Sequence, residues 1–204
     1  MEHFWALPSE KQQIILEAAM AGFATEGYKK AYVSEIAKAA GISKAAVFHY
    51  FGSKKNLYLY LIKFAGDIMQ KEVMPKRDSG STDFFDRIVD AAYRKASVLK
   101  RYPALINFMS SVYFENDTEI LTDIQLLLSQ GEAARSQIAL DGADIMKFKD
   151  GVDPQLVVSI LVKFSEGVAG SRLDTDRSID EIMDEFSKCL NLLRSNLYKE
   201  EFLK

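Results

Sequence analysis

Apolar residues recur at every third or fourth position along most of the chain, which is the spacing of one buried face of an α-helix. The first such run follows Pro8-Ser9-Glu10, where Ser9 is expected to cap a helix that ends near Gly27. Alternating β-branched residues are scarce, so the pattern predicts an all-α fold. Further helices are expected over about 33–40, 44–50, 54–73, 83–100, 103–114, 117–140, 154–171 and 178–199, with exposed connectors at 75–82 and 141–154.

The two short helices at 33–40 and 44–50 are separated by a strong turn signal. Gly41 can adopt the left-handed conformation that ends a helix, and Ser43 can cap the next one by accepting a backbone N–H bond. Ala37 leaves room where the helices cross, and Ile42 and Val47 are expected to be buried. This is the pattern of a helix-turn-helix, whose second helix enters the major groove of DNA. An ordinary helical hairpin has the same spacing and stands as the alternative.

Charge is unevenly divided along the chain, although its formal net value is only −3. Residues 29–55 contain six lysines and a single acidic residue, Glu35, whereas residues 56–204 carry 19 Lys and Arg against 24 Asp and Glu. A basic segment attached to an acidic remainder favours contact with a polyanion through that segment alone. A solvated, lysine-rich surface would explain the same charges equally well.

The segment 9–62 resembles the N-terminal DNA-binding domain of the TetR family of bacterial transcriptional regulators. The residues that carry the resemblance are Ile15–Ala18, Phe23, Gly27-Tyr28, Ile36–Ser43, Lys44, Val47, His49-Tyr50-Phe51, Ser53-Lys54 and Leu57. The resemblance implies a DNA-binding domain over 1–53 and a helical effector-binding and dimerisation domain over 54–204. It also implies a homodimeric, ligand-responsive regulator, most often a repressor, that binds a pseudo-palindromic operator in double-stranded DNA.

The same resemblance implies which side chains meet DNA. Lysine neutralises phosphate and a tyrosine hydroxyl donates a hydrogen bond to it, which supports these roles chemically. Ala46, Phe48 and Ala31 depart from the common pattern because each lacks a hydroxyl often found there, and Phe48 could instead meet a thymine methyl group. The predicted DNA-binding residues are Ser43, Lys44, Ala45, Ala46, Phe48, His49, Tyr50, Lys54 and Lys55.

The remainder of the chain is rich in aromatic residues within helical patterns, for which plain core packing is the simplest interpretation. By resemblance, a small-molecule effector of unknown class is expected in this part, and the last two helices are expected to pair in a dimer. The predicted effector-binding residues are Phe64, Ile68, Tyr93, Asn107, Phe108, Phe164 and Glu166. The predicted dimer residues are Leu156, Ile160, Phe186, Leu190 and Leu193.

Other classes of protein find less support in the sequence. It contains no nucleotide-binding glycine loop, nucleophile elbow or zinc-protease motif, and His49 has only His3 as a possible histidine co-ligand. Neither metal nor cofactor is therefore expected, and the two rivals are a helical ligand-binding protein and a small helical enzyme. The lone Cys189, the lack of a long apolar run and a start unlike a secretory signal predict a cytoplasmic protein without a membrane span.

Overall fold

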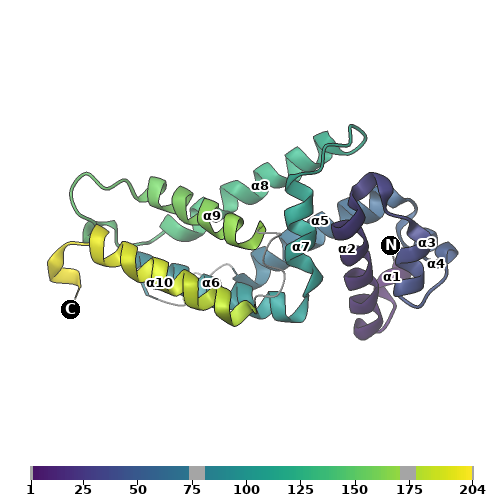
Figure 1. Cartoon of the computed structure of the whole chain (residues 1–204), viewed down its shortest axis with the longest axis horizontal. Helices are drawn as coiled ribbons and strands as arrows, with labels where there is room; N and C mark the ends of the chain where they lie inside the picture. The colour runs from purple at the N-terminus through teal and green to yellow at the C-terminus, as the bar shows by residue number, and fades with distance from the viewer. Residues whose placement is uncertain (1, 74–80, 171–177, 204) are drawn as a thin grey trace. The chain divides into compact units, whose positions relative to one another are not determined.

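A computed structural model describes residues 2–73, 81–170 and 178–203, and helices dominate this part of the chain (Figure 1). No β-strand is present among these residues, which confirms the predicted all-α fold. The α-helices are α1 (Glu2–Trp5), α2 (Ser9–Lys30), α3 (Val33–Ala39), α4 (Lys44–Phe51), α5 (Lys54–Val73), α6 (Phe84–Arg101), α7 (Ala104–Tyr113), α8 (Leu121–Leu140), α9 (Pro154–Gly170) and α10 (Ile179–Leu197). Two single-turn 3₁₀ helices, Ile145–Lys147 and Glu200–Phe202, complete the described elements.

The chain packs as two compact units. The first comprises Met1–Asp67 and Arg101–Gln130, and the second comprises Ile68–Lys100 and Gly131–Lys204. Helix α5 contributes residues to both. These units describe packing, and the functional division at residue 53 stays a prediction.

The core of the first unit joins the N-terminal helices to α7. The Tyr58 ring on α5 lies 4.9 Å from Phe23 of α2 and 5.5 Å from Phe108 of α7, measured between ring centroids. All three side chains are at least 99% buried. A Glu17 carboxylate oxygen on α2 accepts a hydrogen bond from the Ala104 N–H, at 3.1 Å. This acceptor satisfies one of the free donors at the start of α7.

Helix α2 begins differently from the sequence-based expectation. Pro8 occupies the capping position and Ser9 is the first helical residue, so the prediction that Ser9 caps this helix is wrong. The Pro8 carbonyl accepts the first helical bond, from Gln12 at 3.0 Å. Near its other end, α2 is interrupted at Gly27, whose φ of 71° confirms a break where one was predicted.

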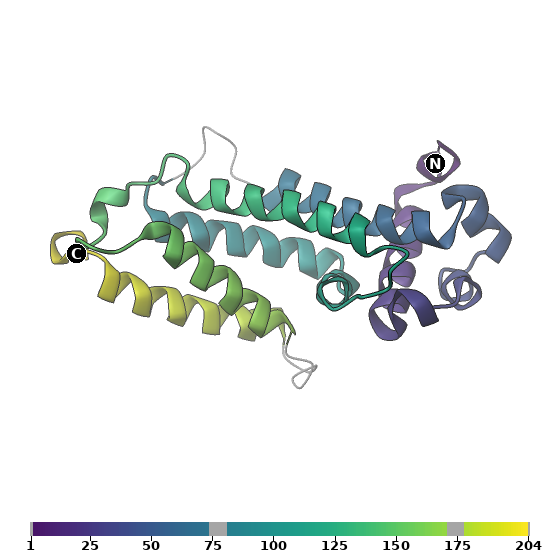
Figure 2. The ribbon, with the colours of Figure 1, turned by 90° about the horizontal axis from the view of Figure 1, so that it is seen from above.

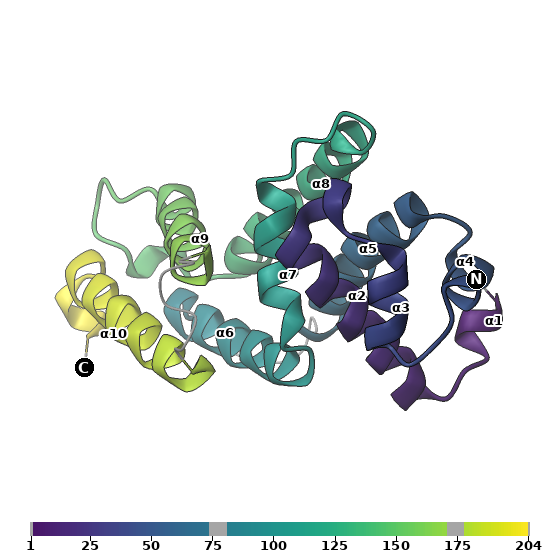
Figure 3. The same cartoon turned by 45° about the vertical axis from the view of Figure 1, so that its right-hand side comes forward.

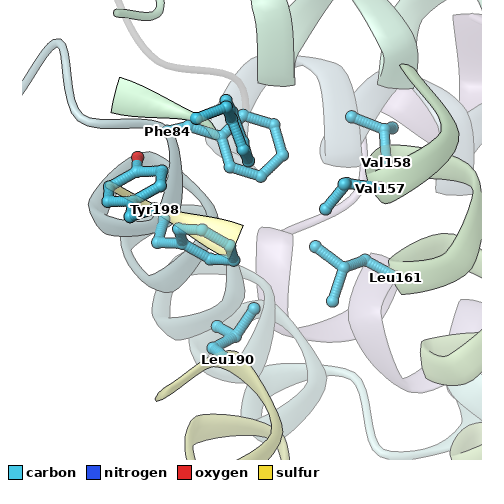
Figure 4. Packing of buried hydrophobic residues seen from close by; sticks show 8 residues of the cluster. Phe84, Val157, Val158, Leu161, Leu190 and Tyr198 are labelled. Carbon is cyan, nitrogen blue, oxygen red and sulfur yellow. The ribbon is translucent and has the colours of Figure 1, made fainter. Parts of the chain in front are cut away.

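In the second unit, α9 and α10 lie side by side and run in opposite directions (Figures 1 and 2). Val157, Val158 and Leu161 of α9 face the aromatic residues of α6 and the end of α10 (Figure 4). Phe148 and Tyr198 form an isolated antiparallel bridge beside this core. The buried core residues are Phe84, Phe85, Phe148, Val157, Val158, Leu161, Leu190 and Tyr198.

Asp83 is a buried charged residue in this unit, with only 2% of its surface exposed. One of its oxygens accepts the backbone N–H bonds of Phe85 and Asp86 and so caps α6. The other lies 2.9 Å from the Lys147 ammonium and 3.2 Å from the Arg194 guanidinium. Asp83 therefore ties α6 to the loop before α9 and to α10.

Candidate nucleic-acid interface

The turn between α3 and α4 has the geometry that the sequence predicts. Gly41 has a φ of 62°, and the Ile42 N–H donates a hydrogen bond to the Ala37 carbonyl at 3.0 Å. Ser43 caps α4, because its hydroxyl oxygen accepts the Ala46 N–H at 3.0 Å. Val47 and Phe51 are buried. Figure 3 shows α3 and α4 as two short helices joined by this turn, which is the form of a helix-turn-helix.

The opposite face of α4 is open to solvent. Lys44, Ala45, Phe48 and His49 are exposed, whereas Ala46 and Tyr50 are partly buried. The Lys44 ammonium lies 5.8 Å from the centre of the Phe48 ring, which is within cation–π range. An exposed face with a lysine, an imidazole and an apolar ring offers partners for phosphate, base edges and a thymine methyl group.

Lys11 of α2 reinforces the turn, although no local signal in the sequence marks this lysine. Its ammonium donates to the Ala40 carbonyl at 3.0 Å and to the Gly41 carbonyl at 3.3 Å. A cation at the end of α3 also matches the negative end of the helix dipole. Lys11 therefore holds α2 against the turn that orients α4.

The two lysines on α5 that are predicted to bind DNA have partners inside the protein. The Lys54 ammonium donates to the Lys29 carbonyl at 3.0 Å and lies 5.0 Å from the centre of the Tyr28 ring. Burial lowers the pKa of Lys54, although nearby carboxylates partly offset this effect. The Lys55 ammonium lies 2.8 Å from the Glu119 carbonyl and 3.0 Å from the Asp123 carboxylate. Contact of either lysine with phosphate would compete with these bonds, and both assignments stay predictions.

Ala31 and its neighbour Tyr32 explain one departure from the family pattern. Ala31 is 3% exposed and faces the core, so a hydroxyl at that position would point away from solvent. Tyr32, the next residue, is 73% exposed at the start of α3. Its phenol offers an exposed hydrogen-bond donor at this end of the helix, one position beyond the residue at which the family pattern has a hydroxyl.

Helix α1 is the largest addition to the predicted interface. Phe4 of α1 is completely buried, and His3 stacks on His49 of α4 with ring centroids 4.4 Å apart. Figure 3 shows α1 beside α4. The apolar pair Phe4-Trp5 ahead of Pro8 was the available sequence signal for this short helix.

The predicted effector-binding residues fall in both units. Phe64 and Phe108 belong to the first, where Phe64 lies 5.4 Å from the Tyr102 ring and Phe108 is completely buried. Asn107, beside Phe108, is exposed. In the second unit, Ile68 is buried and Tyr93 is 57% exposed. Phe164 stacks on Phe186. The Glu166 side chain lies outside the described residues. These assignments stay predictions.

The predicted dimer residues divide into two groups within the second unit. Leu156 and Ile160 on α9 are 58% and 49% exposed. Leu190 on α10 is 2% exposed, and Phe186 and Leu193 pack partly buried against the same core. Leu156 and Ile160 therefore leave apolar surface exposed, whereas the three α10 residues pack in the core of the protomer, and the dimer assignments stay predictions.

Comparison with known proteins points to the same segment as the turn geometry. Residues 15–61 match the family described as bacterial regulatory proteins, tetR family. Over this segment the chain is similar to the DNA-binding part of TetR-family regulators. The transcriptional repressor AcnR of Corynebacterium glutamicum is 45% identical over 56 residues, a match that spans 28% of this chain and only 30% of that repressor.

Likeness of fold to solved TetR-family structures extends over nearly the whole chain. A TetR-family regulator from Chloroflexus aurantiacus has a TM-score of 0.69 at 18% identity, with 98% of this chain and 99% of that chain covered. The regulator FadR from Bacillus subtilis, solved in complex with stearoyl-CoA, has a TM-score of 0.64 at 18% identity, with 86% and 95% covered. At such identities the likeness concerns the fold alone.

The described residues were also compared with the requirements of a metal site and of a membrane span. No group of three or more His, Cys, Asp or Glu side chains lies close enough together there to hold a metal ion. Within the same residues, no helix has both the length and the apolar character needed to cross a membrane.

Proposed function

We propose that this protein is a sequence-specific DNA-binding transcriptional regulator and that α4 is its recognition helix. The observation that carries the proposal is the division of α4 into a buried face, with Val47 and Phe51, and an exposed face, with Lys44, Phe48 and His49. A helix that only packed in a hairpin would need no such exposed chemistry. The match of this segment to the TetR family, and the repressor AcnR among its relatives, support a regulator that acts as a repressor.

We further propose that the regulator acts as a homodimer through α9 and α10 in the segment 54–204. The exposed Leu156 and Ile160 support this, since two copies of such a face can pair into a four-helix bundle. A dimer presents two recognition helices to half-sites one helical turn of about 34–36 Å, or a multiple of it, apart. The expected operator is therefore pseudo-palindromic.

A small molecule would regulate the protein by favouring one of two conformations. FadR, which shares the fold, was solved with stearoyl-CoA, and this supports an effector site in the same segment of the present chain. Helix α5 contributes residues to both packing units and is the natural connection between the effector and the residues 1–53. An effector that binds better to the DNA-free conformation would lower DNA affinity by the ratio of its two affinities.

Selection from a random double-stranded DNA library, followed by gel shift at fixed salt, tests the proposal directly. We expect enrichment of one inverted-repeat motif by the full chain. The double variant Lys44→Ala/His49→Ala should lose this enrichment while its thermal stability stays unchanged, because both side chains are exposed. If no motif is enriched, the alternative of a helical ligand-binding protein is favoured. If the variant enriches the same motif, α4 is not the recognition helix.

A further inference from the structure

Helix α1 is anchored firmly to the C-terminal half of α4. The completely buried Phe4 ring lies 5.0 Å from Phe51 and 6.0 Å from Tyr60, centroid to centroid. The Gln12 side-chain amide of α2 donates to the Trp5 carbonyl at 3.3 Å and to the Leu7 carbonyl at 2.8 Å. An aromatic anchor and two hydrogen bonds therefore fix this short helix against both α4 and α2.

This anchoring places His3 on the surface that α4 exposes. His3 and His49 are both exposed, and their rings stack with centroids 4.4 Å apart and an interplanar angle of 30°. A solvent-exposed histidine ordinarily samples several rotamers, whereas the stack favours one orientation of the His49 ring. Each imidazole also carries a ring nitrogen that can donate a hydrogen bond, whichever tautomer is present.

The charges nearby indicate what this surface can bind. Lys44 is exposed on α4, and Lys11 at the adjacent turn is bonded to carbonyl groups. Glu2 is an exposed acidic residue on α1 next to His3, and no acidic residue occurs on α4. The segment that matches the TetR family begins at residue 15, so α1 lies outside the matched segment.

We infer that His3 is a further DNA-binding residue, which donates a hydrogen bond to a backbone phosphate beside the site read by α4 and holds His49 in its reading orientation. The inference rests on the proposed function. It adds a contact from α1 to those from α4. It also assigns Phe4 a positioning role, because the buried Phe4 affects DNA binding only by fixing the position of His3.

The test compares variants on the duplex selected by the wild-type protein. We expect His3→Ala to bind about 10- to 100-fold more weakly, as one lost hydrogen bond to a charged group implies. Phe4→Ala, which loosens α1, should weaken binding in the same direction. Ser9→Ala, a neutral change at an exposed position that caps nothing, serves as the matched control and should bind like the wild type.

A scan with single methylphosphonate linkages, which remove one phosphate charge at a time, separates contact from mere stability. One linkage per half-site should weaken binding of the wild type and leave binding of His3→Ala unchanged. If every linkage affects both proteins equally, or if His3→Ala binds within twofold of the wild type, the role of His3 is wrong. If the wild type selects no duplex at all, both the proposed function and this inference fail.

Discussion

A Glu115 carboxylate oxygen accepts the backbone N–H of Tyr28 at 2.7 Å, directly after the positive-φ Gly27 in α2. The second oxygen of Glu115 accepts the N–H groups of Asn116 and Asp117 at 3.0 Å each. One side chain thus fixes the break in α2 and the loop before α8. The break also positions the Lys29 carbonyl that receives Lys54.

Replacing Glu115 should therefore destabilise the protein. Glu115→Ala leaves three backbone donors without this acceptor, and we expect a loss of about 1–2 kcal/mol in the free energy of unfolding. Urea denaturation followed by circular dichroism measures it. Glu26→Ala, a nearby exposed glutamate on α2, is the control and should change stability by less than about 0.5 kcal/mol. Equal losses in the two variants would contradict this role of Glu115.

Gly22 lies where α2 packs closely against α3. A Cβ atom added there would lie 2.8 Å from Cγ1 of Ile36. Gly→Ala inside a helix usually stabilises by about 1 kcal/mol, but here the overlap should reverse the sign and cost about 1–2 kcal/mol. The double variant Gly22→Ala/Ile36→Ala should lose less than the sum of the single losses. Simple additivity in a double-mutant cycle would show that the contact is not the cause.

The ion pairs of Asp83 should contribute to the stability of the second unit. Asp83→Asn keeps an oxygen that can cap α6 but removes the charge facing Lys147 and Arg194, and we expect a loss of about 2 kcal/mol. Asp153→Asn changes an exposed capping aspartate, which accepts the Gln155 N–H, and should cost much less. Comparable losses in thermal unfolding would mean that capping, rather than charge, is what matters at Asp83.

The same residue predicts the direction of a pH effect. Burial by itself would raise the pKa of Asp83, but the bonds from Lys147 and the Asp86 N–H and the charge of Arg194 outweigh it and hold the pKa below its ordinary value of 3.8. Stabilisation from a lowered pKa is complete above that ordinary value and is lost as the pH falls through the lower, folded-state value. The stability difference between wild type and Asp83→Asn should therefore shrink in acid, and a constant difference would contradict the assignment.

Salt dependence should reveal the role of Lys44 in DNA binding. If its ammonium neutralises a phosphate, Lys44→Ala should reduce the slope of log affinity against log salt by about 0.9 per protomer. Lys63→Ala removes an exposed lysine from α5 and should leave the slope unchanged. Fluorescence anisotropy over a salt series measures both, and parallel lines for wild type and Lys44→Ala would exclude the contact.

The two groups of predicted dimer residues should respond differently to substitution. Leu156→Glu places a charge on an exposed apolar face and should shift the protein towards monomers in analytical ultracentrifugation without lowering protomer stability. Leu190→Ala opens a cavity in the core and should cost about 2–4 kcal/mol of unfolding free energy. A Leu156→Glu protein that stays dimeric would place the interface elsewhere.

Local signals in the sequence predicted the turn between α3 and α4 well. The positive φ of Gly41, the cap made by Ser43 and the burial of Val47 depend on residues within a few positions of one another. The cap made by Ser53, whose hydroxyl accepts the Asn56 N–H at 3.0 Å, has the same local character. Such features can be read from the sequence because each residue type has a preferred backbone conformation or a short hydrogen-bonding reach.

Contacts between distant residues could not be predicted in this way. The bond between Glu115 and Tyr28 joins positions 87 residues apart, and the stack of His3 on His49 depends on where Phe4 is buried. Ser9 was misassigned because a serine beside a proline satisfies the capping pattern. In the structure, Pro8 occupies the capping position and Ser9 is already helical. The apolar pattern of α10 likewise could not tell whether Leu190 faces its own core or a partner.

The bridge between Phe148 and Tyr198 closes a long segment of backbone on itself. The Lys149 N–H bonds to the Leu197 carbonyl at 2.8 Å, and the Lys199 N–H bonds to the Lys147 carbonyl at 2.9 Å. Helices α9 and α10 both lie between these two ends in the sequence. Neither helix can therefore leave the core freely while the bridge is formed. The two helices should therefore unfold locally as one cooperative element. The rigidity of the face around Leu156 then depends on the bridge at the far end of α10.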